Sequence, residues 1–336
     1  AVLSGAEGWT DIKKFGDKKL DWLRKFRRFE NGIPVDDTIA RIIGALDPHK
    51  MTACFISWVN EIRSQAGQHQ FIAIDGKTFR HSAQAEPNNA LHSITVWLRA
   101  QGLVFCQHKS EGKKNEIKRV QSLIETLELA GATVTLDAMH CQKATAKLLR
   151  RRKADYVLGV KDNQKGLREE LQWWFEGFEG QWPRDASTFE QTNAGHGRIE
   201  VRRYVQLPLT EKLVYASGWE GARSVVRVER ERHVGQKTTS ETVYYISSHA
   251  PNAAFMAEAI RSPWEVENKA HWVLDVVYKE DDSRIRRNDG AQNVGLIRRL
   301  CMNLARLHPG KDSMRGKLKA AGWDDDYREE LVFGIN

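Results

Sequence analysis

Three acidic residues, each in a different local setting, are the best candidates for chemistry in this sequence. Asp75 follows the apolar residues 71–74, and Asp137 follows the run Val-Thr-Leu at 134–136. Glu267 lies far downstream, in a segment whose pattern predicts a helix. Two carboxylates at strand ends and a third from a helix can hold two divalent cations about 3.5–4 Å apart for phosphoryl transfer. Hard oxygen ligands favour Mg²⁺ or Mn²⁺ as those two ions.

The charge of the chain points to nucleic acid as the substrate. The net charge is +8 over 336 residues, and the isoelectric point is about 9.2. Clustered Lys and Arg suit contact with a phosphate backbone. The basic residues gather in three segments, at 13–28, 150–153 and 227–232. Any one cluster is equally well explained as a solvated face, but the three together favour nucleic acid.

Length and composition limit the class of protein further. The 336 residues are enough for two or three domains. No apolar run approaches the roughly 18 residues that a membrane span needs, and the first residues do not resemble a secretory signal. The four cysteines are scattered, with no C-x-x-C pair. This favours free thiols in a reducing cytoplasm over disulfides or a zinc site.

The order of the expected elements predicts an α/β fold with a ribonuclease-H-like catalytic core. Residues 8–66 have the pattern of amphipathic helices. Strands are expected at 71–79, 93–98 and 103–108, a helix at 117–129, a strand at 132–137, a helix at 142–152 and a strand at 154–160. In this βββ-α-β-α-β order, Asp75 lies on the first strand and Asp137 on the fourth. Those two strands are expected to be neighbours at the centre of the sheet.

A β-rich block is expected to interrupt this core before its last helices. Residues 163–180 are predicted as a helix. Alternating segments at 199–207, 212–219, 224–232 and 239–247 predict strands, and helices return at 253–260, 264–278 and 294–307. The predicted domains are a helical N-terminal DNA-binding or dimerisation region (1–68), the first part of the core (69–180), an inserted β-rich domain (181–250) and a helical completion of the core (251–336).

Each acid also has an ordinary structural explanation. Asp75 with Gly76 could form a hairpin turn, and Asp137 could cap the helix after it. The third acid could be Glu265 instead of Glu267. At about 100° per residue the two side chains lie about 200° apart around a helix, so only one can face the metals. Glu267 is preferred because it shares its face with other polar side chains. The acids Glu258, Glu280, Asp281 and Asp282 are expected to be solvated charges.

Several motifs, in order along nearly the whole chain, resemble the insertion-sequence transposases of the H-repeat-associated, ISAs-type group. They are Ala-Ile-Asp-Gly-Lys at 73–77, Thr-Leu-Asp-Ala-Met-His-Cys-Gln at 135–142, Ala-Asp-Tyr-Val-Leu-Gly-Val-Lys-Asp-Asn-Gln at 154–164 and Val-Glu-Asn-Lys-Ala-His-Trp-Val-Leu-Asp-Val at 266–276, with Gly-Ala-Glu-Gly-Trp at 5–9 and Phe-Glu-Asn-Gly-Ile-Pro at 29–34 in the head. The resemblance implies a DDE-type core with Asp75, Asp137 and Glu267 as catalytic and metal-binding triad. It also implies an inserted β-domain and a truncated DNA-binding head.

One departure concerns the residues around the third acid. Related transposases with an inserted β-domain carry Tyr-x2-Arg-x3-Glu-x6-Lys there. In this chain Pro263 stands at the Arg position and Leu274 at the Lys position. Arg261 would restore the spacing only if Glu265 were the acid. The candidates to hold DNA in place of the missing Arg and Lys are Lys269 and Arg284.

Further residues are candidate DNA contacts, each with a structural alternative such as a turn, a cap or a core histidine. They are Lys77, His140, Lys161, Asn163, His196, Arg198, Lys269, His271 and Arg284. Trp173 or Trp174 could stack on a base, whereas Trp264 and Trp272 are expected to pack in the interior.

The predicted function is that of a DDE transposase that uses two Mg²⁺ or Mn²⁺ ions. Metal-bound water would hydrolyse a strand at the element end, and the freed 3′-hydroxyl would attack target DNA. Asp75 would bridge the ions. The expected partners are double-stranded DNA (terminal inverted repeats and target) and a second copy of the chain, in a bacterial cytoplasm near the nucleoid. The alternatives are a domesticated, catalytically silent DNA-binding protein and a stand-alone nuclease.

Overall fold

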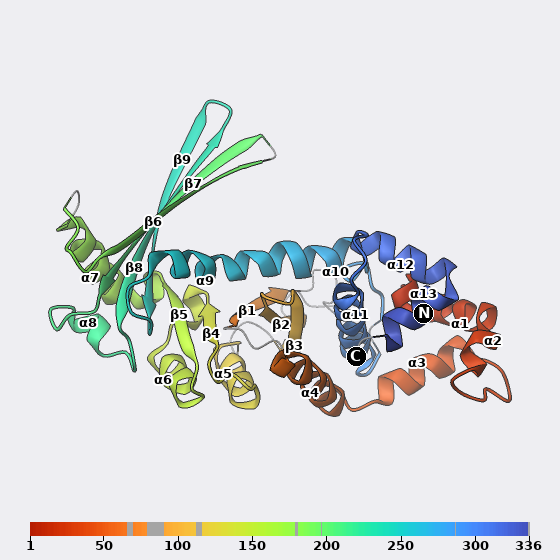
Figure 1. Ribbon diagram of the computed structural model, residues 1–336. Coiled ribbons are helices and arrows are strands. Elements are labelled where there is room, and N and C mark those ends of the chain that lie inside the picture. The colour runs from red at the N-terminus through yellow and green to blue at the C-terminus, as the bar shows by residue number, and fades with distance from the viewer. Residues whose placement is uncertain are drawn as a thin grey trace. The chain divides into compact units, whose positions relative to one another are not determined.

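The computed structural model of the protein describes residues 1–65, 70–78, 91–111, 116–178, 181–195, 197–285 and 287–334 (Figure 1). The chain forms two compact units. The first contains Ala1–Gly67, Gly76–Asn115 and Glu265–Asn336, and the second contains Gln68–Asp75 and Glu116–Trp264. Among the residues described, no helix is both long enough and apolar enough to span a membrane.

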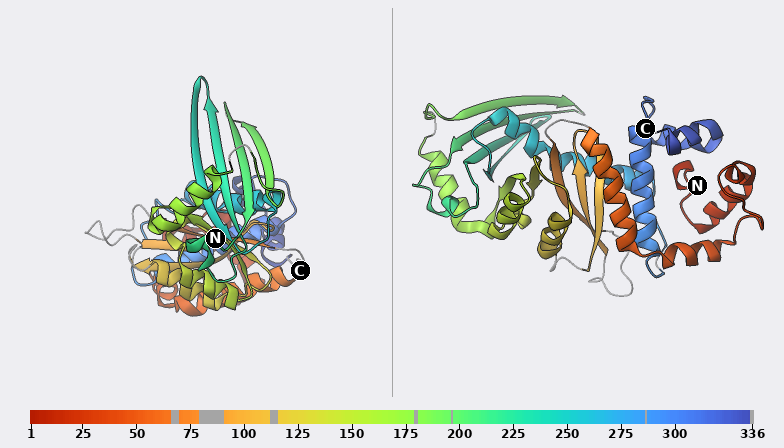
Figure 2. Two further views of the ribbon diagram at one scale, coloured as in Figure 1. Left: turned by 90° about the vertical axis from the view of Figure 1, so that its left-hand side faces the viewer. Right: turned by 60° about the horizontal axis from the view of Figure 1, so that its bottom comes forward.

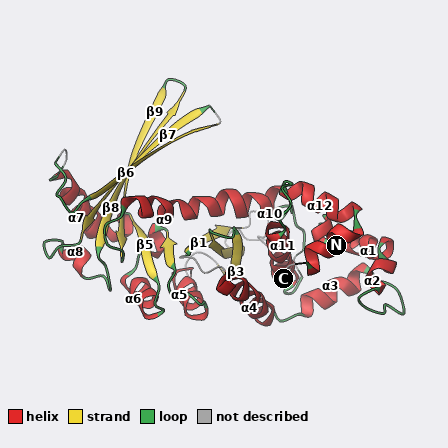
Figure 3. Ribbon diagram, viewed as in Figure 1, coloured by secondary structure: helices red, strands yellow, loops and turns green. Residues whose placement is uncertain are grey.

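The first unit is mostly helical, as the red ribbons of Figure 3 show. Its elements are α1 (Trp9–Lys18), α2 (Leu20–Arg24), α3 (Asp36–Ala45), α4 (Pro48–Gln65), β2 (Leu91–Leu98), β3 (Leu103–Glu111), the π-helical segment η6 (Val266–His271), α10 (Trp272–Val276), α11 (Gly290–Leu307), α12 (Met314–Trp323) and α13 (Asp325–Phe333). Helix α11 holds them together through buried polar groups. Its Asn303 side chain bonds both the N–H and the carbonyl of Val104 on β3, and Asn293 donates to the carbonyls of Ile43 and Leu46 at the end of α3.

A buried ion pair in the first unit corrects one expectation from the sequence. Glu280 is 4% exposed and accepts two hydrogen bonds from the fully buried Arg299 of α11, at 2.6 and 3.0 Å. It is therefore a structural carboxylate, not a solvated charge. Its sequence neighbours Asp281 and Asp282 are acids too, so local composition gave no sign that one of them is buried.

The second unit contains most of the strands. Its elements are β1 (Phe71–Thr78, whose last three residues belong to the first unit), α5 (Glu116–Thr126), β4 (Thr133–Leu136), the short turn η4 (Ala138–His140), α6 (Lys143–Arg151), β5 (Asp155–Val160), the turn η5 (Asp162–Gln164), α7 (Lys165–Glu176), β6 (Ser187–Gly195), β7 (Arg198–Pro208), α8 (Val214–Ser217), β8 (Ser224–Val234), β9 (Lys237–Ser247) and α9 (Ala253–Glu265). Helices α5 and α6 lie on one side of β4 and β5, and α9 runs along the other (Figure 1).

The strands form a mixed sheet in the order β3-β2-β1-β4-β5-β9-β8-β7-β6. The β1–β4 and β4–β5 pairs are parallel, whereas β2–β3, β5–β9 and the pairs beyond β9 are antiparallel. The fold is therefore mixed α/β, and the expected βββ-α-β-α-β order of elements is present. The strands after α7 extend this same sheet, because β9 pairs directly with β5. They form the long hairpins in the left view of Figure 2.

The prediction of a strand at 212–219 is wrong, because this stretch is a loop with the short helix α8. Leu213, Ala216 and Trp219 are buried there, and their three-residue spacing is helical rather than the alternation of a strand. The strand that the sequence analysis missed is β6. Its side chains are mostly exposed and polar, as suits the outer edge of a sheet, so hydrophobic alternation could not reveal it.

The two helices predicted at 253–260 and 264–278 are a single continuous helical run. Pro263 lies inside α9, which passes without interruption into the π-helical η6 and then into α10. Buried α9 residues such as Met256, Ala257 and Ile260 pack into one apolar cluster with Tyr204 of β7 and strand residues of β5, β8 and β9. This packing outweighs the local preference of Pro to end a helix.

Candidate active site

Strand pairing in the second unit places Asp75 and Asp137 on neighbouring strands. In the parallel β1–β4 pair, Ile74 is the partner of Leu136, so the two aspartates follow at the same level. Strand β1 continues to Thr78, so the alternative of a hairpin turn at Asp75 and Gly76 is wrong. Asp137 occupies the N-cap position of η4, but its side chain makes no capping hydrogen bond. Its carboxylate is instead 54% exposed.

The loop that carries Asp137 is held by the loop that follows β5. Asn163 donates from Nδ2 to the Ala138 carbonyl at 2.6 Å, and Gln164 donates from Nε2 to the Cys141 carbonyl at 2.9 Å. A Cβ atom at Gly159 would lie 3.4 Å from the Ala138 nitrogen, so a larger residue there would crowd this loop. Asn163, expected as a DNA contact, thus braces the backbone beside Asp137.

His140 lies between two carboxylates. Its ring is buried, and Nε2 is 3.4 Å from Oε1 of Glu116 and 3.9 Å from Oδ1 of Asp137. Glu116, also buried, was not a candidate, because it lies just before the helix predicted at 117–129 and its local sequence does not distinguish it. His140, expected as a DNA contact or a core histidine, is therefore a buried histidine beside two carboxylates.

Glu267 lies in a rare backbone conformation. Residues Val266–His271 form a π-helical segment inside the long helical run. Such segments are uncommon and frequent at functional sites, because the wider turn changes the direction of the side chains. Val266, Ala270 and His271 of this segment are buried, whereas the Glu267 side chain is 72% exposed.

The neighbouring Glu265 has different surroundings. Its carboxylate is 13% exposed and accepts hydrogen bonds from Nε of Arg99 at 3.2 Å and from Nζ of Lys269 at 3.1 Å. Two cations therefore already engage Glu265. Lys269, a candidate DNA contact, forms one of these ion pairs. The surroundings favour Glu267 as the acid that remains available for a metal ion.

His271 and Arg306 hold the π-helical segment. The buried His271 ring places Nδ1 3.4 Å from Oε2 of Glu267 and Nε2 3.3 Å from Oγ1 of Thr95 on β2. This position suits orienting Glu267 better than the DNA contact expected of His271. Arg306 of α11 donates to the Lys269 carbonyl and, at 2.7 Å, to the Gly102 carbonyl. The sequence offered no signal for Arg306, because it is one of several basic residues on an amphipathic helix.

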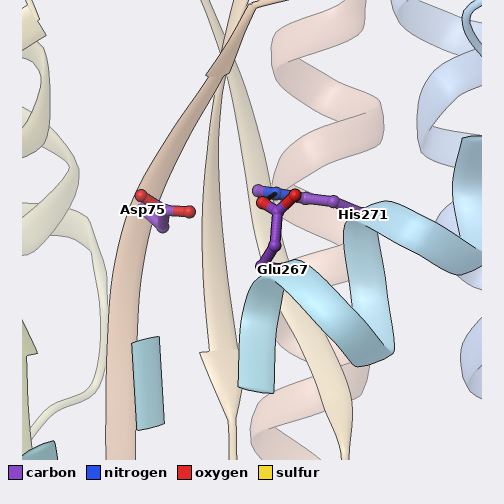
Figure 4. A group of neighbouring side chains, drawn as sticks. All are labelled: Asp75, Glu267 and His271. Carbon is purple, nitrogen blue, oxygen red and sulfur yellow. Dashed lines mark hydrogen bonds and ion pairs between the residues drawn. The ribbon is translucent and has the colours of Figure 1, made fainter. Parts of the chain in front are cut away.

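Asp75, Glu267 and His271 each offer a ligand atom that could bind a metal ion, Asp75 from the second unit and the other two from the first (Figure 4). Figure 4 shows the Glu267 and His271 side chains side by side on the helical run, with Asp75 on β1. Two carboxylates and an imidazole are a donor set that Mn²⁺ accepts readily and that also suits Mg²⁺ through its oxygens. Asp137 is not a member of this group, although the strand register makes it the neighbour of Asp75.

A thiol nucleophile at this site is disfavoured. Burial, and to a smaller degree the charge of Asp137, raise the pKa of the Cys141 thiol to about 12. The group is therefore a neutral thiol at any physiological pH, and the thiolate is the reactive form.

The remaining candidate contacts lie elsewhere or are not described. Lys161 and Arg284 are exposed, and Arg198 pairs with Glu200 at 3.1 Å. The Lys77 side chain and the whole of His196 lie outside the described residues.

The tryptophans depart from expectation. Trp264 and Trp272 are 49% and 56% exposed, so the prediction that both are interior packing residues is wrong. Trp173, a candidate for stacking, is 69% exposed.

Comparison with known proteins identifies the family. The model of the "Transposase DDE domain" matches residues 66–304, and that of a "DDE_Tnp_1-associated" domain matches residues 1–59. The "H repeat-associated putative transposase YhhI" of Escherichia coli K12 is 37% identical over 99% of this chain and 90% of its own length. The "Inactive transposase YbfQ" of the same strain is 63% identical over 13% of this chain and 51% of its own length.

Among solved structures, a piggyBac transposase synaptic complex with hairpin DNA matches 79% of this chain and 56% of that chain, with 12% identity and a TM-score of 0.41. That likeness is too distant to carry an argument. The family model matches residues 66–304, and the YhhI relative is similar over almost the full length. The chain therefore belongs to the transposase DDE domain family.

Proposed function

We propose that this protein is a DDE-type DNA transposase that cleaves DNA strands at the ends of an insertion sequence and joins them to target DNA. The observation that carries the proposal is the β1–β4 register, in which Ile74 pairs with Leu136 and the next residues are Asp75 and Asp137. Two carboxylates on adjacent parallel strands are what a pair of hard cations requires. The catalytic core is proposed to be ribonuclease-H-like, with the strands after α7 as its insertion.

Asp75, Asp137 and Glu267 are the residues proposed to hold the metal ions. Bound Mg²⁺ or Mn²⁺ would supply an activated water or 3′-hydroxyl and would neutralise charge on the leaving oxygen. The protein itself contributes by holding these carboxylates in place. Asn163 and Gln164 fix the loop after Asp137, and His271 lies against the Glu267 carboxylate. Glu265 is not proposed as a ligand, because its carboxylate is already paired with Arg99 and Lys269.

The substrate proposed is double-stranded DNA, both the terminal inverted repeats of the element and the target. The net charge of +8 supports a polyanionic partner. Joining two element ends to one target needs two active sites, so a homodimer on DNA is proposed. A location in the bacterial cytoplasm, near chromosomal DNA, is proposed on the same ground.

The test is cleavage of a duplex that carries the terminal repeat of the element, in Mg²⁺ or Mn²⁺. The parent is expected to cut, and Asp137→Asn and Glu267→Gln are each expected to reduce cutting at least about a thousandfold, the worth of several kcal/mol of metal stabilisation. Glu265→Gln should retain most of the activity. Full activity in Glu267→Gln with loss in Glu265→Gln would move the third ligand to Glu265 and contradict the assignment.

A second candidate is a DNA-binding protein without transfer activity, favoured by the similarity to a relative named as inactive. It would bind DNA tightly with or without divalent cation and would cut nothing. A strand-transfer assay with supercoiled target DNA separates the third possibility, a stand-alone nuclease, which would cut the repeat but yield no joined product.

A further inference from the structure

A cavity of about 350 Å³ lies in the second unit, between the ribbon formed by β7, β8 and β9 and the end of α9. The register places Arg202, Arg230 and Glu241 in one row across the ribbon, and Glu200, Arg232 and Thr239 in the next. Ile260, Arg261 and Trp264 of α9 line the opposite side. None of these residues belongs to the proposed metal site.

Two buried donors that line the cavity have no hydrogen-bond partner among the residues that the structure describes. They are the hydroxyl of Tyr204, a residue that is 1% exposed, and Nη1 of Arg202, which is shielded from solvent. A buried polar group without a partner costs about 1–3 kcal/mol, so such groups are rare and call for an explanation. Both can donate a hydrogen bond, so the ligand that would satisfy them carries acceptor oxygens.

The positive charge of the residues that line the cavity favours an anionic ligand. Four arginines line it, at positions 202, 230, 232 and 261, against three glutamates. Two of these glutamates are also engaged by cations that do not line the cavity: Glu200 by Arg198, and Glu231 by Arg203 and His233. Arg232 is exposed and makes no hydrogen bond or ion pair with any described residue. The cavity therefore has guanidinium groups in excess.

The rim adds an aromatic surface. The Trp264 ring is 49% exposed, and the Arg261 guanidinium carbon lies 5.7 Å from its centroid. Arg261 is fixed by hydrogen bonds to Gln191 and Asn193 of β6. An exposed indole beside an arginine can stack a base or cover a sugar. A bare inorganic anion would use none of this surface.

We propose that this cavity binds a phosphodiester group of a DNA strand, with the adjoining nucleoside against Trp264. The phosphate oxygens accept hydrogen bonds from the Tyr204 hydroxyl and from the arginines, which form bidentate contacts with phosphate. The inference rests on the proposed function, because it takes DNA as the substrate. It adds a second DNA-binding site, outside the proposed metal site.

The test measures binding of a fluorescein-labelled duplex by anisotropy, in EDTA, over a series of salt concentrations. The variants are Tyr204→Phe, which removes one hydroxyl, and Arg232→Gln, which changes an exposed side chain and should fold normally. The matched control is Arg223→Gln, an exposed arginine directly before β8 that does not line the cavity.

Both cavity variants are expected to weaken binding about 3- to 10-fold at low salt, within the range of the net contribution of one typical hydrogen bond. Arg232→Gln should also lower the slope of log K against log salt by about 0.9, the value for one phosphate contact on a duplex. Arg223→Gln should bind like the parent.

Equal binding by the parent and both cavity variants would overturn the site but leave the proposed function untouched, because cleavage is not measured. An equal loss in Arg223→Gln would also overturn it, since surface charge alone would then explain the effect. A parent that binds no DNA would overturn the proposed function itself. The last measurement is the binding of deoxyadenosine monophosphate. If the parent binds this nucleotide tightly and Tyr204→Phe does not, the cavity binds free nucleotides and the proposed DNA site is wrong.

Discussion

The imidazole of His271 lies with Nδ1 3.4 Å from Oε2 of Glu267, and its other nitrogen lies 3.3 Å from Oγ1 of Thr95. The histidine is almost fully buried, whereas the carboxylate is largely exposed. A fixed ring therefore borders a carboxylate that would otherwise sample several rotamers in solvent. Groups that contact a metal-ligating carboxylate in this way commonly set its orientation.

This relationship predicts that His271→Ala reduces metal-dependent DNA cleavage by about 10- to 100-fold, the usual effect of losing a group that orients a metal ligand. Thr95→Val, which removes the partner on the other ring nitrogen, should give a smaller loss in the same direction. The measurement is the cleavage rate as a function of Mn²⁺ concentration. A rate and Mn²⁺ dependence unchanged in His271→Ala would contradict the orienting role.

Arg306 is expected to stabilise the segment that carries Glu267. It donates to the carbonyls of Lys269 and Gly102, and its guanidinium carbon lies 4.7 Å from the centroid of the Trp97 ring. Arg306→Met should lower the free energy of unfolding by about 2 kcal/mol, the scale of a charge-assisted hydrogen bond. Urea denaturation measures this. The exposed Arg315→Met is the control and should stay within about 0.5 kcal/mol of the parent.

The buried pair of Glu280 and Arg299 should be costly to break on one side only. Glu280→Ala leaves the guanidinium of a fully buried arginine without its carboxylate, and we expect a loss of about 3–5 kcal/mol in the free energy of unfolding. Replacing both partners, as Glu280→Leu with Arg299→Met, should recover much of that loss. If the double variant loses as much stability as Glu280→Leu and Arg299→Met lose when each is made alone and the two losses are added, the pair is not coupled.

The cysteines should differ sharply in reactivity. Burial raises the pKa of Cys141 to about 12 and that of Cys301 to about 11, so at pH 8 fewer than about one thiol in a thousand is ionised at either position. Cys54 is exposed. Alkylation of the native protein with iodoacetamide at pH 8, followed by peptide mass mapping, should label Cys54 before Cys141 and Cys301. Early labelling of Cys141 would contradict the buried, neutral thiol.

The sequence by itself determined the family, the mixed α/β order of elements and the neighbouring positions of Asp75 and Asp137. Each of these depends on local signals. Apolar runs predict strands and amphipathic stripes predict helices, and the βββ-α-β-α-β order predicts that the first and fourth strands are adjacent. The short motifs around Asp75, Asp137 and Glu267 were sufficient to indicate the family, which the comparisons confirmed.

Tertiary structure decided the surroundings of each side chain, because burial depends on residues far away in sequence. Glu265 and Glu267 are two residues apart, yet only Glu265 is held by Arg99, which is 166 residues away. Glu280 stands beside two other acids but is paired inside the protein with Arg299. The edge strand β6, the continuous helix through Pro263 and the π-helical turn at Glu267 are likewise stabilised by packing and long-range hydrogen bonds, which leave no local pattern in the sequence.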